Sequence, residues 1–154
     1  MKMAKGPIKN IARNRKARFE YEIEERLEVG LQLLGTEVKS LRQGRASIGE
    51  SYIKFEKNEA FLVAAHIPIY PQAGLNNHEP NRARKLLMKK KEIAQWARRS
   101  QERGYSVIPL QLYFHGPWIK LEIAIGKGRK HYDKRQKLKE QSDKRDAARA
   151  LRRN

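Results

Sequence analysis

The sequence predicts a mainly β fold with added α, namely a small closed antiparallel β-barrel with two or three helices and a basic C-terminal tail. Alternating apolar and polar residues recur in several segments, which indicates half-buried strands. These segments are residues 19–33, 51–67, 105–114 and 118–125. They amount to five or six strands, and closing such a set into a barrel removes its exposed edges. Residues 127–154 are too basic and too poor in apolar side chains to build a core, so they form an extension.

The first strand segment is long and carries a conspicuous acidic face. In residues 19–33, apolar side chains share one parity, while most of the acidic residues share the other. Glu25 interrupts the apolar parity, which predicts a bulge or a bend there. The segment is either one long strand or two strands joined near Gly30.

A short helix and a hairpin are predicted next. Residues 36–43 favour a helix with Thr36 as its N-cap. Residues 51–55 and 60–67 alternate around the turn sequence EKNE, which predicts a hairpin. Residues 66–81 contain three prolines and several turn-forming residues, so we expect a loop.

A second helix and two further strands complete the predicted domain. Residues 82–103 favour a helix, because Leu86 and Ile93 share one apolar stripe. Residues 105–114 and 118–125 alternate and are joined at the sequence HGP. Pro109 cannot donate a backbone hydrogen bond, so its strand is predicted to be an edge strand or to be bulged there.

The net charge of +18 is concentrated at the two ends of the chain. Residues 1–18 hold seven Lys or Arg and no acidic residue, whereas residues 127–154 hold twelve against four. Residues 19–126 hold sixteen basic and thirteen acidic residues and are nearly neutral. Basic ends that cannot pack favour a polyanionic partner, and nucleic acid is the leading candidate. A membrane surface is disfavoured because neither end has an apolar helix face, and a mere solubility tail is the remaining alternative.

The sequence contains no recognisable catalytic or metal-binding motif. The chain has no Cys, and its four His lack metal-ligand spacing. The sequence GKGRK at residues 126–130 lacks the spacer and the Lys-Ser/Thr of a phosphate loop. The acidic residues of the first strand are too widely spaced to converge on one ion. We therefore expect no enzyme activity, metal or cofactor. With no signal peptide and no apolar run of membrane-spanning length, we expect a cytoplasmic protein.

Several motifs occur in a fixed order along residues 12–151. They are NRKARFEYEIEE, GTEVKSLRQGRASIGESY, RKLLMKKKEI, RGYSVIPLQLYF, WIKLEIAIGKGRKHYDKR and KLKE. In order and spacing they resemble the SsrA-binding protein family, also called small protein B. The resemblance implies an OB-like β-barrel RNA-binding domain at residues 13–126. A basic arm at 1–12 would precede it, and a tail at 127–154 would follow.

The resemblance also implies a non-enzymatic role in trans-translation. Members bind the tRNA-like domain of transfer-messenger RNA (tmRNA, also SsrA RNA). They bring the charged RNA, with elongation factor Tu, to stalled ribosomes for ribosome rescue and peptide tagging. The tail, disordered when free, would enter the decoding centre and the empty mRNA channel as a helix, chiefly against small-subunit rRNA. A monomer is expected. The alternative is a general or ribosomal-type RNA-binding protein with basic extensions.

The residues that match the family's motifs fall into two groups. The tmRNA-binding group is Asn14, Lys16, Arg18, Glu28, Arg84, Lys85, Leu87 and Lys120. The tail group, expected near the decoding centre and in the mRNA channel, is Lys127, Gly128, Arg129, Lys130, Tyr132, Asp133, Lys134, Arg135, Ala150 and Leu151.

Overall fold

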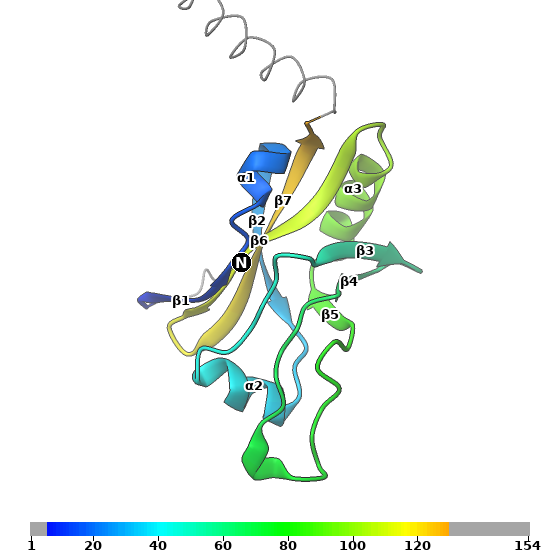
Figure 1. Cartoon of the computed structure of the whole chain (residues 1–154). Helices are drawn as coiled ribbons and strands as arrows, with labels where there is room; N and C mark the ends of the chain where they lie inside the picture. Colours follow the sequence, from blue (N-terminus) through cyan, green and yellow to red (C-terminus); the bar gives the residue numbers. More distant parts are fainter. Residues whose placement is uncertain (1–5, 130–154) are drawn as a thin grey trace, which may run out of the picture.

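The computed structural model describes residues 6–129, which form one curled sheet with three α-helices (Figure 1). The seven strands are all paired antiparallel, in the order β1-β6-β7-β2-β5-β4-β3. The strands are β1 (Ile8–Arg13), β2 (Tyr21–Leu31), β3 (Tyr52–Glu56), β4 (Glu59–Val63), β5 (Arg84–Leu87), β6 (Tyr105–His115) and β7 (Trp118–Gly128). The helices are α1 (Ala17–Glu20), α2 (Gly35–Arg42) and α3 (Lys90–Ser100), with a 3-10 turn at Pro71–Ala73.

Three long strands, β6, β7 and β2, form the centre of the sheet. The alternation predicted for residues 118–125 is confirmed, because Leu121, Ile123 and Ile125 are fully buried in the main core. Val29 of β2 and Leu112 of β6 join them in that core. The opposite parity of β7 is therefore directed to the outer face of the sheet, where a binding site can form.

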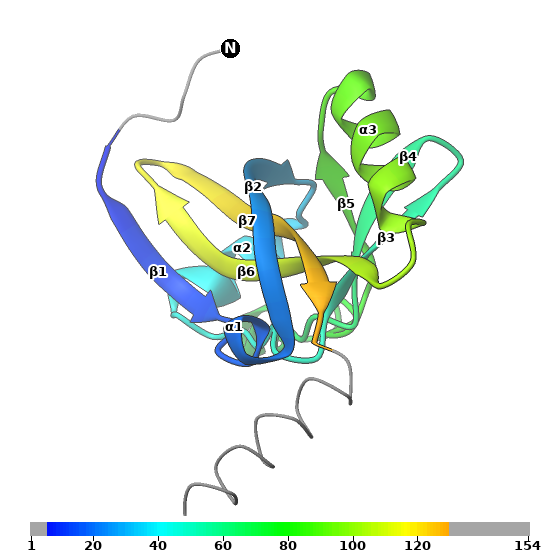
Figure 2. The same ribbon diagram turned by 90° about the horizontal axis from the view of Figure 1, so that it is seen from above.

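The sheet curls strongly, but closure into a barrel is not confirmed. Figure 2 shows the curl from above, with α3 beside the end of the sheet formed by β5, β4 and β3. In the part of the chain that the structure describes, β1 pairs only with β6 and β3 pairs only with β4. Residues of β3 do contact β6, so the curl brings the sheet back on itself without completing the ladder.

Two bulges redirect side chains, and both positions were predicted. The register of β2 shifts between Ile23 and Glu25. Tyr21 and Ile23 consequently pack under α1, whereas Leu27 on the other side of the bulge packs against the main core. The apolar residues of one parity therefore lie on opposite faces of the sheet on the two sides of the bulge. Because of the same shift, the acidic side chains do not form one row.

The bulge of β6 has a similar consequence. The register shifts between Pro109 and Gln111, in a strand that lies between β1 and β7 and is not an edge. Ile108 packs with Ala17 and Ala124 in a small cluster under α1. Strict alternation would place Ile108 and Leu112 on one face, but the bulge puts them on opposite faces of the sheet.

Some local predictions are confirmed and others are corrected. The hairpin of β3 and β4 is confirmed, and its turn residues Lys57 and Asn58 have φ of 49° and 63°. Such positive φ values are typical of tight hairpin turns. The predicted helix at 82–103 is too long, because residues 84–87 form β5 and α3 begins at Lys90. The sheet also begins before residue 13, since β1 pairs with β6.

The start of α2 differs from the prediction as well. Thr36 does not cap the helix, since its Oγ1 lies 2.8 Å from Nδ1 of His78. The N–H of Leu34 donates instead to the Glu37 carboxylate at 2.8 Å. Within residues 6–129, no helix is long and apolar enough to cross a membrane.

Candidate nucleic-acid interface

The outer face of the central strands carries a continuous set of polar side chains. Cross-strand pairing sets Glu28 opposite Glu122, and Lys120 opposite both Gly30 and Tyr113, so these residues share one face. Arg26 on β2 reaches Glu122 at 3.9 Å. Two depressions open along this face, and each contains residues that the sequence analysis selects.

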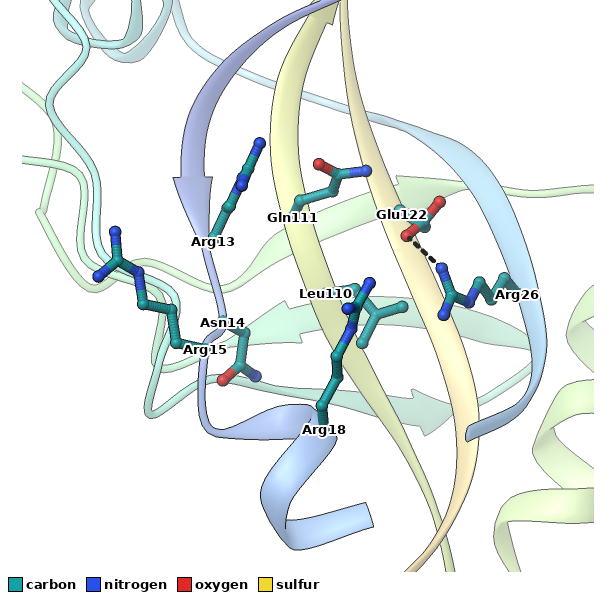
Figure 3. Close-up of a pocket in the computed structure, with 8 residues that line it drawn as sticks. All are labelled: Arg13, Asn14, Arg15, Arg18, Arg26, Leu110, Gln111 and Glu122. Carbon is teal, nitrogen blue, oxygen red and sulfur yellow. Dashed lines mark ion pairs between the residues drawn. The ribbon is translucent and has the colours of Figure 1, made fainter. Parts of the chain in front are cut away.

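The first depression, here the arginine depression, has a volume of about 510 Å³ (Figure 3). It is lined by Arg13, Asn14, Arg15, Arg18, Arg26, Leu110, Gln111 and Glu122. Within residues 6–129, the guanidinium groups of Arg13, Arg15 and Arg18 have no carboxylate within ion-pair distance. They are therefore available to an anionic ligand such as a phosphate.

Asn14 fixes the chain that carries these arginines. Its backbone N–H donates to the carbonyl of Leu110 at 2.8 Å, and its Nδ2 donates to the carbonyl of Pro109 at 2.9 Å. Asn14 is thereby attached to the bulge of β6, and its role in the free protein is to hold the turn between β1 and α1. Its Oδ1 is buried and has no protein partner among the described residues.

The second depression, here the glutamate depression, has a volume of about 480 Å³. It brings together four residues that the sequence analysis selects: Glu28, Lys85, Leu87 and Lys120. Leu87 is 56% exposed and offers an apolar surface. Gly30 leaves room beside it, because a Cβ at that position would lie 3.3 Å from Leu87 Cβ. Carboxylate, cationic and apolar surfaces therefore meet in one shallow site.

Two residues that the sequence analysis did not select hold the Glu28 carboxylate. The Tyr113 hydroxyl donates to Glu28 Oε2 at 2.5 Å, and His115 Nδ1 lies 3.0 Å from the same oxygen. No partner of the second oxygen, Oε1, is seen among the described residues. Tyr113 and His115 lie in a strand that the sequence analysis treated as a source of core residues. Their alternation with those core residues is the one sequence signal that places them on the outer face.

The electrostatics of this group favour an ionised carboxylate. Burial raises the pKa of Glu28, but the hydrogen bonds from Tyr113 and His115 outweigh burial and lower that pKa overall. Burial, together with the carboxylate of Glu28, raises the pKa of Tyr113, so its hydroxyl remains a donor. At neutral pH the site therefore presents a fixed anionic acceptor within a basic surface.

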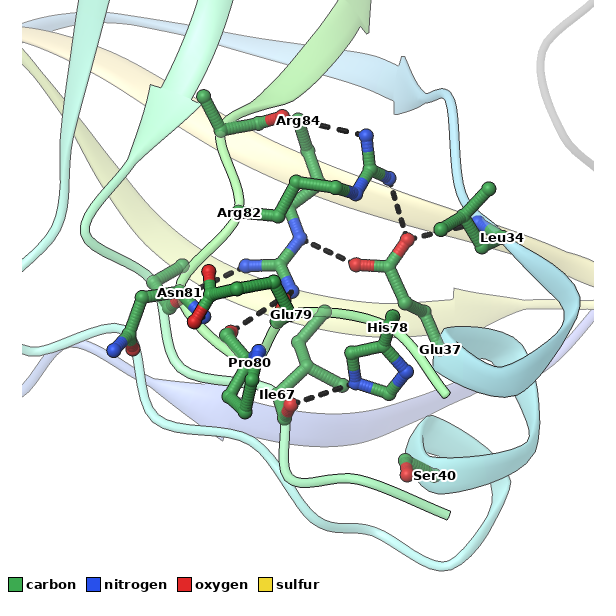
Figure 4. A network of polar contacts seen from close by, with 12 residues as sticks. Leu34, Glu37, Ser40, Ile67, His78, Glu79, Pro80, Asn81, Arg82 and Arg84 are labelled. Atoms are coloured by element: carbon green, nitrogen blue, oxygen red, sulfur yellow. Dashed lines mark hydrogen bonds and ion pairs between the residues drawn. The ribbon is translucent and has the colours of Figure 1, made fainter. Parts of the chain in front are cut away.

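Arg84, which the sequence analysis placed in the tmRNA-binding group, is not at this surface. Its side chain is 0% exposed, and its Nε donates to Glu37 Oε2 at 2.6 Å (Figure 4). Its Nη1 donates to the carbonyl of Ala65 at 2.7 Å, and its Nη2 donates to that of Pro80 at 2.9 Å. Strand alternation turns Arg84 inward and Lys85 outward, so Arg84 cannot contact RNA in this structure.

The Glu37–Arg84 pair is the centre of a polar network that attaches α2 to the loop before β5. Burial raises the pKa of Glu37, but hydrogen bonds from Arg82, the Leu34 amide and Arg84 lower it overall. His78 joins the network from the same loop, with Nε2 donating to the carbonyl of Ile67 at 2.8 Å. The loop predicted for residues 66–81 is confirmed apart from the 3-10 turn at Pro71–Ala73, and the contact of His78 with Thr36 attaches it to α2.

The remaining predicted residues lie at the edges of this region. Lys16 is 63% exposed and pairs with Glu50 at 2.7 Å. Lys127 lies within β7, paired with Glu22 and Tyr105. The N–H of Gly128 donates to the carbonyl of Gly104, and that of Arg129 donates to the carbonyl of Glu20, each at 2.8 Å. Strand β7 therefore continues to Gly128, past the boundary at 127 that the sequence predicts. Lys130, Tyr132, Asp133, Lys134, Arg135, Ala150 and Leu151 lie outside the described residues.

Comparisons with known proteins indicate the family to which this chain belongs. The SmpB protein family model matches residues 11–153. The SsrA-binding protein of Bifidobacterium adolescentis is 51% identical over 145 residues, covering 94% of this chain and 91% of that protein. The SsrA-binding protein of Clavibacter michiganensis is 54% identical over 143 residues, covering 93% and 90%.

A solved structure is also similar. A chain of the structure described as "tmRNA-SmpB: a journey to the center of the bacterial ribosome" matches with a TM-score of 0.65 and 37% identity. The match covers 77% of this chain and 84% of that chain. On the family model and on these relatives, the chain belongs to the SmpB family of SsrA-binding proteins.

Proposed function

We propose that this chain is a tmRNA-binding factor of trans-translation, and that it binds the tRNA-like domain of that RNA. The names of its relatives and the tmRNA-SmpB ribosome structure support the proposal. The observation that carries it is the glutamate depression, in which Glu28, Lys85, Leu87 and Lys120 come together from three strands. The function is binding rather than catalysis.

The chemistry of the depression suits an RNA loop. Lys85 and Lys120 supply phosphate contacts that depend on salt but not on sequence. Glu28 Oε1 can accept hydrogen bonds from base or ribose donors, and Leu87 offers an apolar surface to an unstacked base. Recognition by shape requires a rigid surface, and the buried network around Glu37 supplies that rigidity in an OB-like frame.

The tail serves a later step in this proposal. The first three residues of the tail, 127–129, are held by the sheet, which fixes the point at which the tail begins. We expect it to enter the decoding centre and the empty mRNA channel of a stalled ribosome and to become helical against small-subunit rRNA. The chain would act as a monomer in the cytoplasm and would meet elongation factor Tu through the charged tmRNA.

A binding comparison tests the proposal. The full chain and a variant ending at Arg129 are titrated with the tRNA-like domain and with an ordinary elongator tRNA across a salt series. We expect both proteins to prefer the tRNA-like domain, and the tail to add to the salt slope by roughly 0.7–0.9 per phosphate contact. No preference in either protein would favour a general RNA-binding protein instead.

Substitutions in the folded domain and in the tail test the two roles separately. Glu28→Gln keeps the shape of the side chain but removes its charge, so we expect weaker and less selective RNA binding. Glu56→Gln is the matched control, since Glu56 is an exposed glutamate of the hairpin whose one ion pair within residues 6–129 is with Lys54. Lys134→Ala combined with Arg135→Ala should impair peptide tagging more than RNA binding. Equal loss of both activities would contradict the assigned role of the tail.

A further inference from the structure

The two tryptophans of the chain have opposite environments. Trp96 of α3 is 3% exposed and packs in the main core. Trp118, the first residue of β7, is 61% exposed, although it belongs to a well-paired strand. An indole left in solvent on a regular strand is a candidate binding surface, because Trp normally gains stability from burial.

Trp118 lies on the same face as the glutamate depression. It pairs with His115 on β6, and Lys120 two residues later pairs with Tyr113. Paired side chains of adjacent strands share a face, so the indole is beside the imidazole that contacts Glu28. Lys120 follows at about 6.8 Å along the strand. An aromatic plane, a cation and a carboxylate acceptor therefore occur in succession.

The backbone that carries the indole is held by neighbouring strands. Trp118 closes the turn between β6 and β7, in which Gly116 has φ of 60°. The N–H of Gly116 donates to the carbonyl of Pro7 at 2.9 Å, which attaches this turn to the start of β1. On the other side, Ile8 is paired with His115 and extends the apolar row across the sheet. The platform is therefore built on three strands rather than on a free loop.

We propose that Trp118 is a stacking platform for one unpaired nucleobase, next to the nucleotides bound at the glutamate depression. The inference rests on the proposed RNA-binding function and deepens it, because it identifies the ligand there as an unstacked loop nucleotide. Every base has a π-face that can stack on an indole, and the adjacent Lys120 suits the phosphate that flanks such a base.

Indole fluorescence of the full chain gives the first test. Because Trp96 is buried, acrylamide quenching of the free protein reports chiefly on Trp118. We expect the tRNA-like domain of tmRNA to protect Trp118 from acrylamide and to quench its emission, as stacking requires. If the indole of Trp118 is equally accessible to acrylamide in the complex, the proposal is overturned. This test requires no mutant protein.

Affinity measurements on full-length variants give the second test. Trp118→Phe keeps an aromatic face and should bind the tRNA-like domain nearly as well as wild type. Trp118→Ala and Trp118→Leu should bind about 5- to 150-fold more weakly, the usual loss when one stacked base loses its platform. Tyr52→Ala is the control, since Tyr52 is also exposed, at 48%, but lies on the edge strand β3. Trp96 remains in every variant to report folding.

The outcomes separate this inference from the proposed function. If wild type prefers the tRNA-like domain and Trp118→Ala binds it equally well, the platform is overturned while the proposed function stands. Retained affinity in Trp118→Leu with loss in Trp118→Ala indicates a plain apolar contact and also overturns stacking. If wild type shows no preference for the tRNA-like domain, the proposed function and the platform fall together.

Discussion

Glu37 and Arg84 form an ion pair without solvent access, with Oε2 of the carboxylate 2.6 Å from Nε of the guanidinium and both side chains 0% exposed. The pair connects α2 with β5, and β5 carries Lys85 and Leu87 to the glutamate depression. Removing the carboxylate of Glu37 leaves the Arg84 charge buried with backbone carbonyl oxygens as its remaining partners among the described residues. The geometry of the candidate interface therefore depends on a buried pair that lines neither depression.

Glu37→Gln should lower the free energy of unfolding by about 3–5 kcal/mol, the usual cost of breaking a buried pair. Chemical denaturation at pH 7 measures it. Glu50→Gln, at an ion pair that is largely exposed, is the control and should leave the unfolding midpoint unchanged. Equal effects of the two substitutions would show that the buried pair adds nothing beyond an exposed one.

Acid should remove the contribution of Glu37 in a defined direction. The folded protein holds the pKa of Glu37 below its ordinary value of 4.5. A lowered carboxyl pKa stabilises the fold fully above the ordinary value, and this stability is lost as the pH falls through the folded value. The difference in unfolding free energy between wild type and Glu37→Gln should therefore be largest near neutrality and should shrink below pH 4.5. A difference that grew on acidification would contradict the assigned charge state.

Tyr113→Phe should change the pH profile of RNA binding. Loss of the hydroxyl removes a hydrogen bond that lowers the pKa of Glu28, so this pKa should rise. RNA affinity should then begin to fall at a higher pH than in wild type during acidification. Tyr105→Phe removes a similar bond, from Tyr105 to Glu24 at 3.0 Å, outside both depressions. It should leave the profile unchanged, and a shift in this control would implicate the fold rather than Glu28.

Gly126→Ala should disturb the sheet where the tail begins. A Cβ at Gly126 would lie 2.9 Å from Cβ of Tyr21, so the backbone of β2 or β7 would have to move. We expect a loss of about 1–3 kcal/mol in thermal or chemical unfolding, as in other overpacked sites. Gly35→Ala is the control, because a Cβ there meets no atom within 4 Å. If Gly126→Ala left the stability unchanged, the two strands would be able to move apart at little cost in free energy.

The elements that sequence reasoning predicted well are those whose signal is local. The alternation of β7 marks its buried face, and Pro109 marks the bulge of β6. The missed elements depend on distant partners. β5 has the composition of the helix that follows it, and only its pairing with β2 and β4 makes it a strand. The short polar strand β1 is likewise stabilised by β6, about a hundred residues away.

In the candidate site, too, residues marked by a local motif were predicted and residues that depend on distant partners were not. The motifs selected Glu28, Lys85, Leu87 and Lys120, and the fold brings these residues into one depression. The motifs also selected Arg84, which a single step of strand alternation turns into the core. Among 35 basic and 17 acidic residues, nothing local indicates which Arg will be buried beside which Glu. Tyr113 and His115 were missed because their partner lies on another strand.

The pairing of β2 with β7 also sets the order of events during synthesis. Their paired residues are about 100 positions apart, so β2 must wait for its partner for about 5–20 s at ordinary elongation rates. Until then, its apolar side chains are exposed on the nascent chain. Glutamates are interspersed among these apolar side chains, and their charge opposes premature association with other strands. They are Glu22, Glu24, Glu25 and Glu28. Glu28 thus protects the nascent chain before it contributes to any binding site.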